Sequence, residues 1–386
     1  MRRILVLASV VVGLVASALP AGAAVRLPGE ILPDGETRPV IRSVELMAPG
    51  AHNRLLEADL VFSVGTDLGI RRYEYRWNHA TFGAIHAANV VNPRVSYETI
   101  LPNTPYVLEV RAVDRHGRAS DWRTAWSGVT PAPPLVIVAG DSVASGYQKQ
   151  WFTQGSKCRD EGYSYGATVV QAVAAGLPQA WAPRYVNIAW PGAGVGDVLE
   201  GGSDSCSTFH PSQVDQIVQY SDPATWNAVV VTAGINSTNW VDVVTRLTRN
   251  TALSLTDSGD KRACQAAVAK DWNLDGRSQA ITDTTARIVD EIASRSNASL
   301  YWTSYYELAG TRIAPLWSPI GFECTEEMDL ALGRLHDTIL AGMDDRARWV
   351  DLTKAPIGTQ RWAGWPHPNP EGHTVIGLEV ASAIIG

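Results

Sequence analysis

Ser142 is the first residue whose position suggests chemistry. It follows the apolar run Leu135–Ala139 and the turn residues Gly140 and Asp141. The run is short and two prolines precede it, so it indicates a buried strand and not a helix. Ligands of open α/β sheets bind beyond the carboxyl ends of the strands, where a serine is a candidate nucleophile. The alternative is that Ser142 caps a helix, a position that serine favours.

Three later blocks carry residues that could complete such a site. Gly192 follows an apolar run at 185–189, and a glycine lets a backbone N–H approach a ligand closely. Asn236 follows a second run at 228–232, and its amide can donate to a developing oxyanion. His367 lies in the segment WPHPNPEGH, and histidine is the natural base at neutral pH. Taken alone, the glycine and asparagine blocks are more simply explained as plain turns, and a single histidine is more often structural.

The elements that must position these residues alternate along the chain from 132 to 386. Apolar runs are expected to be strands at 135–139, 185–189, 228–232, 299–303 and 348–352. Helical segments are expected at 164–175, 212–220, 283–294 and 326–343 and after 370. This alternation predicts an α/β domain with a parallel sheet covered on both faces.

The preceding part, 38–131, has only short β-type runs separated by turn residues, which predicts an all-β sandwich. Its stretch Leu101–Asp114, LPNTPYVLEVRAVD, resembles the penultimate strand of fibronectin type III domains. That resemblance implies that Tyr106 is a corner tyrosine whose hydroxyl bonds to nearby backbone. A short proline-rich linker, TPAPP, follows.

The four blocks, in their order, resemble the SGNH hydrolases, also called GDSL esterases or lipases. The resemblance runs from Leu135 to the C-terminus and implies a flavodoxin-like three-layer α/β/α domain. It implies that Ser142 is the nucleophile and His367 the general base. The oxyanion hole would be formed by the N–H groups of Ser142 and Gly192 and by the Asn236 side chain.

The resemblance therefore predicts a serine esterase that forms an acyl-enzyme and needs no cofactor or metal. Its substrate would be an acyl lipid or an acetylated polysaccharide. A binding or adhesion protein without catalysis, built on a hydrolase scaffold, is the alternative.

One departure from the family pattern concerns the group that orients the histidine. The family has an aspartate three residues before it, where this chain has Gly364. We expect a backbone carbonyl near Trp365 to orient His367, which would make the site a dyad. Asp351, at the end of the last strand, is a weaker substitute.

Two further departures concern the asparagine and histidine blocks. Ser237 stands where the family's third block has an acid, so the donor is kept and a nearby carboxylate is lost. His373 competes with His367 as the base. We prefer His367 because it directly precedes proline and occupies the motif position, whereas His373 would lie in the last helix.

Residues 1–24 predict a secretory signal peptide, with two arginines, an apolar run and the small residues Ala21-Gly22-Ala23. A transmembrane anchor is the less favoured alternative, because the run is short. An exported chain with an even number of cysteines is expected to form disulfides, in any of three pairings for four cysteines. The resemblance suggests Cys158 with Cys206 and Cys264 with Cys324.

The formal net charge of −7, without basic runs, argues against a nucleic-acid partner. No stretch after the leader is apolar enough for membrane insertion, so we expect a secreted monomer whose partner is its ester substrate. The segment Asp271–Gly276, DWNLDG, resembles a calcium loop, but Thr282 stands where the bidentate glutamate belongs. A solvated acidic loop is the favoured interpretation.

Overall fold

The computed structural model describes residues 30–31, 37–46, 56–64, 69–78, 81–86, 94–147, 162–240, 266, 268, 272, 274–306, 322–355, 357, 362–364 and 367–386. The predicted signal peptide and the expected disulfide partners Cys158 and Cys264 lie outside these residues. Asp271 and Asn273 of the calcium-like loop also lie outside them.

The predicted parallel sheet is present and has five strands in the order β11-β10-β14-β15-β16. All neighbouring strands pair in parallel. Their bounds are β10 (Leu135–Gly140), β11 (Arg184–Asn187), β14 (Asn227–Thr232), β15 (Ser299–Thr303) and β16 (Ala347–Val350). Numbered along the chain, this order is the 2-1-3-4-5 of flavodoxin-like sheets. Every residue of β10 and β14 is buried, as expected for strands covered on both faces.

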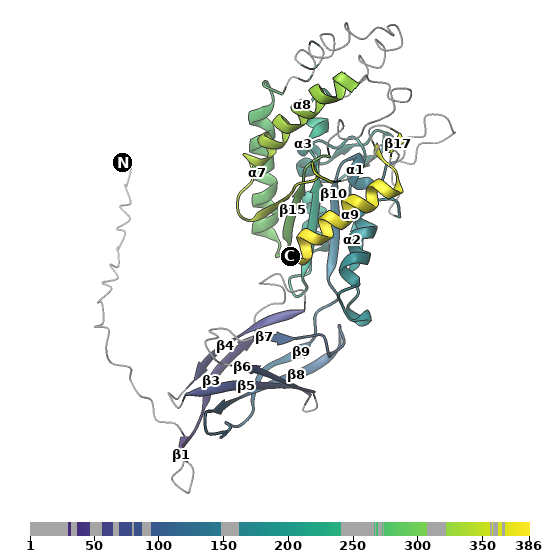
Figure 1. Cartoon of the computed structure of the whole chain (residues 1–386). Coiled ribbons are helices and arrows are strands. Elements are labelled where there is room, and N and C mark those ends of the chain that lie inside the picture. The colour runs from purple at the N-terminus through teal and green to yellow at the C-terminus, as the bar shows by residue number, and fades with distance from the viewer. Residues whose placement is uncertain are drawn as a thin grey trace, which may run out of the picture.

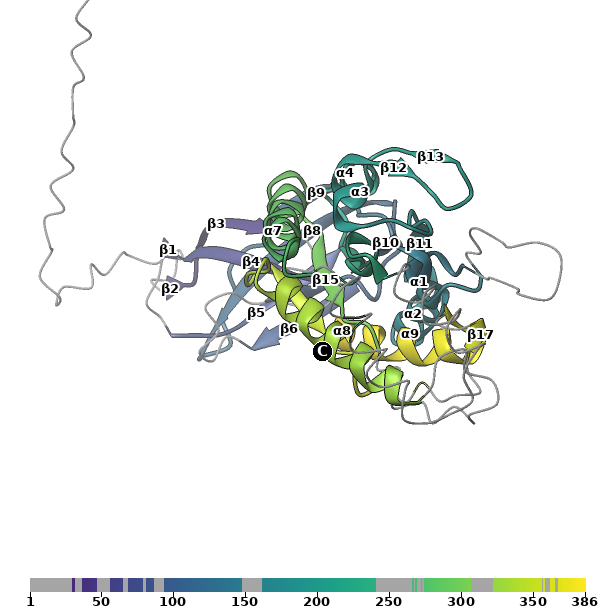
Figure 2. The same ribbon diagram turned by 90° about the horizontal axis from the view of Figure 1, so that it is seen from above.

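Helices cover both faces of the sheet (Figures 1 and 2). The first layer contains α2 (Tyr165–Ala174) packed against α9 (Pro370–Ile385). In the second layer, α7 (Ser278–Arg295) contacts α3 (Val195–Glu200), α4 (Gln213–Tyr220) and α8 (Phe322–Leu340). The buried residues Ile281, Ile288 and Ile292 recur at helical spacing along α7, which fixes the face that it presents.

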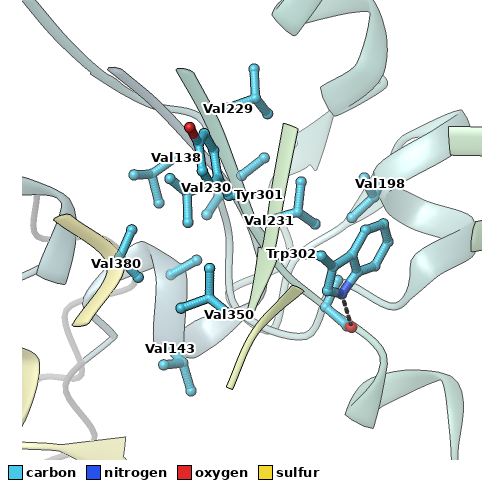
Figure 3. Packing of buried hydrophobic residues seen from close by; sticks show 14 of the residues in the cluster. Val138, Val143, Val198, Val229, Val230, Val231, Tyr301, Trp302, Val350 and Val380 are labelled. Atoms are coloured by element: carbon cyan, nitrogen blue, oxygen red, sulfur yellow. Dashed lines mark hydrogen bonds between the residues drawn. The ribbon is translucent and has the colours of Figure 1, made fainter. Parts of the chain in front are cut away.

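The core of the domain lies on both sides of the strands (Figure 3). Val138 and Val230 are fully buried in neighbouring strands, with Val380 of α9 on one side and Val198 of α3 on the other. The indole N–H of Trp302 donates to the Ala233 carbonyl at 3.3 Å. That bond ties β15 to the segment that follows β14.

Antiparallel strands form the predicted sandwich that precedes this domain. One sheet has the order β3-β4-β7 and the other β6-β5-β8-β9. Their bounds are β3 (Ile41–Leu46), β4 (Glu57–Val64), β5 (Ile70–Trp77), β6 (Thr81–His86), β7 (Arg94–Ser96), β8 (Pro105–Asp114) and β9 (Arg123–Val129). The Tyr106 hydroxyl accepts a bond from the Leu101 N–H at 3.4 Å, which is the backbone contact expected of a corner tyrosine.

Short strand pairs complete the described elements. They are β1 (Glu30–Ile31) with β2 (Thr37–Arg38), β12 (Gly202–Ser203) with β13 (Phe209–His210), and β17 (Trp362–Gly364) with β18 (His367–Pro368). Within the described ranges, no helix combines the length and apolarity that crossing a bilayer requires.

A tryptophan of the α/β domain joins the two domains. Trp181, in the 3-10 turn Gln179–Trp181, belongs to the core of the sandwich and is 1% exposed. Its indole N–H donates to the Ile100 carbonyl at 2.7 Å, and its ring lies 6.0 Å from that of Tyr97. The sandwich thus sits at the amino ends of the parallel strands, and the one-turn helix α1 (Ser142–Ser145) lies at their carboxyl ends (Figure 1).

Candidate active site

Ser142 stands at a sharp turn directly after β10. Gly140 has φ +120°, and a Cβ at this position would overlap the Thr232 carbonyl, so only glycine is accommodated. The Gln213 side chain holds the same residue through both backbone groups, at 2.6 Å to its N–H and 3.0 Å to its carbonyl. Asp141 then caps the one-turn helix α1 (Ser142–Ser145) by accepting from the Val143 N–H at 2.9 Å.

His367 lies beside this serine. Its Nε2 is 2.8 Å from the Ser142 Oγ, which is hydrogen-bond distance between a base and a nucleophile. The Tyr147 ring packs edge-on against the imidazole, with centroids 5.1 Å apart. His367 pairs with Gly364 across β17 and β18, and Asn369 caps α9 immediately afterwards. Ser142 and His367 are partly exposed, whereas Asp141 is buried.

Gly192 and Asn236 lie in turns that touch each other. Gly192 has φ +93°, and a Cβ there would approach the Ser205 Oγ to 2.7 Å. The Asn236 Nδ2 donates to the Ala193 carbonyl at 3.1 Å. An amide nitrogen carries two N–H groups, so one can anchor the side chain while the other is offered to a substrate oxygen.

Ser237 makes a second link between these turns. Its Oγ accepts from the Val195 N–H at 2.8 Å, at the start of α3. The serine that stands in place of the family's acid therefore serves a helix N-terminus, whose free N–H groups need an acceptor.

Three neighbouring parallel strands bring these residues to one edge of the sheet. Ser142, Gly192 and Asn236 follow β10, β11 and β14, and His367 reaches the same edge from the C-terminal segment. β11 lies on one side of β10, and β14 and the later strands lie on its other side. The crevice at such a switch point of the strand order is where open α/β sheets bind ligands.

Asp141 is a buried carboxyl group that directly precedes the serine. It has no exposed surface, and its Oδ2 accepts from the Tyr305 hydroxyl at 2.5 Å. Burial raises its pKa to about 7, against the opposing effect of the hydrogen bonds from Tyr305 and the Val143 N–H. Sequence reasoning missed Tyr305, because only the fold brings the end of β15 next to this turn.

The competing histidine occupies a different environment. His373 is 2% exposed, and neither ring nitrogen has a hydrogen-bond partner among the described residues. The rings of Tyr163 and Tyr165 pack near it, with centroids 5.2 Å and 6.4 Å from the imidazole. Burial lowers its pKa to about 3, with a smaller contribution from His367, so it is neutral at pH 7. Its surroundings are those of a packed side chain.

Asp351, the weaker substitute for the missing acid, is engaged elsewhere. Its Oδ1 accepts from the Thr353 N–H at 2.9 Å and from the Thr353 hydroxyl at 2.6 Å. Partial burial would raise its pKa, but these bonds outweigh that effect and lower it. Trp365 lies outside the described residues, so the expected role of a nearby carbonyl stays a prediction.

Cys206 is in disulfide form. The side chains of Cys158, Cys264 and Cys324 are not described, so the two predicted pairings stay predictions. Within the described ranges, no group of three His, Cys, Asp or Glu side chains could hold a metal ion.

No protein-family model matches the chain. No curated protein is significantly similar to it. Similar solved structures include a family two carbohydrate esterase from Clostridium thermocellum in complex with cellohexaose (11% identity, 82% of this chain and 85% of that chain, TM-score 0.32). Others are the native aryl esterase of M. smegmatis (10%, 66% and 98%, 0.37) and a carbohydrate acetylesterase from Sinorhizobium meliloti (10%, 65% and 98%, 0.35).

Proposed function

We propose that this chain is a secreted serine esterase of the SGNH type that hydrolyses carboxylic esters through an acyl-enzyme. The observation that carries the proposal is the 2.8 Å separation of the Ser142 Oγ and the His367 Nε2 at the switch point of the sheet. A partly exposed serine with a base at hydrogen-bond distance is the basic requirement for nucleophilic catalysis by a hydroxyl group.

In the proposed reaction, the Ser142 Oγ attacks the ester carbonyl carbon and its proton moves to the His367 Nε2. The carbonyl π electrons pass to the oxygen, and this oxyanion is stabilised by the N–H groups of Ser142 and Gly192 and by the Asn236 amide. Collapse of the intermediate expels the alcohol, which takes the proton from His367. A water molecule, deprotonated by His367, then attacks the acyl carbon. The bond between this carbon and the Ser142 Oγ breaks, the Oγ takes the proton from His367, and the acid is released.

The leader sequence at 1–24 supports secretion, and the even cysteine count fits an oxidising compartment. The proposed substrate is an acyl lipid or an acetylated polysaccharide. We further propose that the sandwich is a fibronectin type III-like module, on the strength of the Leu101–Asp114 pattern and the Tyr106 contact.

A p-nitrophenyl ester series from acetate to palmitate tests the function and the acyl preference together. The wild-type chain should release p-nitrophenol, and Ser142→Ala should reduce kcat/KM to the background rate while the melting temperature stays unchanged. Ser294→Ala, at an exposed position in α7, is the matched control and should keep full activity. Wild-type-like turnover by folded Ser142→Ala would remove the serine mechanism. The absence of turnover in the wild type would favour a binding protein.

A further inference from the structure

The hydroxyl of Tyr305 contacts two groups that each stand one residue before a candidate catalytic residue. It donates to the Asp141 Oδ2 at 2.5 Å, and Asp141 precedes Ser142. It accepts from the Ile235 N–H at 3.1 Å, and Ile235 precedes Asn236. A single oxygen atom therefore joins the turn that carries the nucleophile to the turn that carries the oxyanion donor.

The backbone of Tyr305 is also fixed in place. Tyr305 is 4% exposed and follows Ser304, the first residue after β15. Its backbone N–H donates to the His336 Nε2 at 3.0 Å. Burial lowers the pKa of His336 to about 4, so that nitrogen remains an acceptor at neutral pH. The N–H of Ser304 donates to the Val350 carbonyl at 2.9 Å, which fixes the preceding residue to β16.

The carbonyl of Ile235 is held by Thr238 within the asparagine turn, but its N–H finds its partner outside the turn, at the Tyr305 hydroxyl. Ile235–Ser237 is a single 3-10 turn without a side-chain cap, and Gly234 before it has φ +139°. A backbone N–H at the beginning of such a turn has no partner within the turn. Since the Tyr305 oxygen supplies that partner, the direction in which Ile235 enters the turn depends on it. Asn236 is the next residue, so the path of its backbone depends on this contact, while its amide is anchored on the Ala193 carbonyl at 3.1 Å.

We propose that Tyr305 is a positioning residue that sets the Asn236 amide relative to Ser142 by bridging Asp141 and Ile235. The expected kinetic effect rests on the proposed esterase function. The bridge itself does not, because it is a contact within the chain. Oxyanion donors act on developing charge, so a displaced amide should lower kcat and leave substrate binding almost unchanged.

The kinetic test is a double-mutant cycle with Tyr305→Phe and Asn236→Ala, measured with p-nitrophenyl acetate. Loss of a whole oxyanion donor costs about 10²- to 10³-fold in kcat. We expect Tyr305→Phe to lower kcat by about tenfold or more with KM within about threefold of wild type. In the Asn236→Ala background the same change should cost less than about threefold, because the amide that it positions is already absent.

Tyr301→Phe is the matched control. It removes a buried phenol hydroxyl from the same segment, but that hydroxyl bonds to Arg348 and not to either turn. It should keep the wild-type kcat. If Tyr305→Phe costs the same factor in both backgrounds, or costs nothing while folded, the positioning role is wrong.

Amide hydrogen exchange provides a readout that does not require activity. Tyr305→Phe should accelerate exchange in a peptide covering residues 233–238, whereas Tyr301→Phe should leave it unchanged. Unchanged exchange in Tyr305→Phe would overturn the bridge. If the wild type fails to hydrolyse any ester, the proposed function fails, and the exchange result still decides whether Tyr305 holds this turn.

Discussion

The contacts of His367 and Asp351 predict very different losses of activity when each side chain is replaced. His367→Ala deletes the nitrogen that lies 2.8 Å from the Ser142 Oγ, and a positioned general base contributes about 10² to 10⁴ in rate. This corresponds to about 3 to 5 kcal/mol of transition-state stabilisation. Asp351→Asn leaves an oxygen that can still accept from Thr353, so it should cost less than about tenfold, or about 1.4 kcal/mol.

The assay is kcat/KM with p-nitrophenyl acetate for both variants, with thermal unfolding as the check that each is folded. His367→Ala should lose at least about a hundredfold and Asp351→Asn less than about tenfold. A folded Asp351→Asn as inactive as His367→Ala would make Asp351 a third member of a triad. The reasoning about the Thr353 contact would then be refuted.

Three further changes test the fold around the site. Trp181→Ala should lower the free energy of unfolding by about 3 to 5 kcal/mol in chemical denaturation, since it removes a large, fully buried side chain; a loss below about 1 kcal/mol would contradict its place in the core of the sandwich. The neutral, buried His373 has a folded pKa of about 3 and an ordinary unfolded pKa of about 6.5, so its contribution to stability is lost as pH falls from 6.5 toward 3. Between pH 7 and pH 4 the melting temperature of His373→Phe should therefore fall less than that of the wild type. His116→Gln, at an exposed position, is the control and should fall as the wild type does. An equal fall for His373→Phe and wild type would contradict the assignment of a buried, neutral His373. Gly140→Ala should destabilise the chain by more than about 1 kcal/mol, measured by urea unfolding, and abolish hydrolysis, because its φ of +120° and the Thr232 carbonyl leave no room for a Cβ; a stable, active variant would contradict it.

The sequence predicted the sheet well because burial on both faces leaves a continuous apolar run. The expected strand at 299–303 is β15 itself, and 228–232 differs from β14 by one residue. The helix expected at 283–294 is longer in the structure, because α7 begins at Ser278 without a side-chain cap that could mark its start. The turn glycines and the polar residues after the strands could be recognised because each follows an apolar run closely in the sequence.

Contacts between distant segments could not be predicted in this way. Gln213 holds the backbone of Gly140, and Tyr305 reaches Asp141, although nothing local in the sequence marks either side chain for that role. Ser237 was recognised only as a missing acid, and its bond to the Val195 N–H depends on how α3 approaches the neighbouring turn. These groups support the site from other elements, and their roles follow from topology.

Trp181 has a consequence for the order in which the protein can fold. All strands of the sandwich are synthesised before this residue, since β9 ends at Val129. Domains tend to fold as units while the chain emerges from the ribosome, the N-terminal one first. Because Trp181 belongs to the core of the sandwich and bonds to its Ile100 carbonyl, that core can be completed only after this segment of the second domain has been made. The final consolidation of the sandwich is therefore coupled to the appearance of the α/β domain.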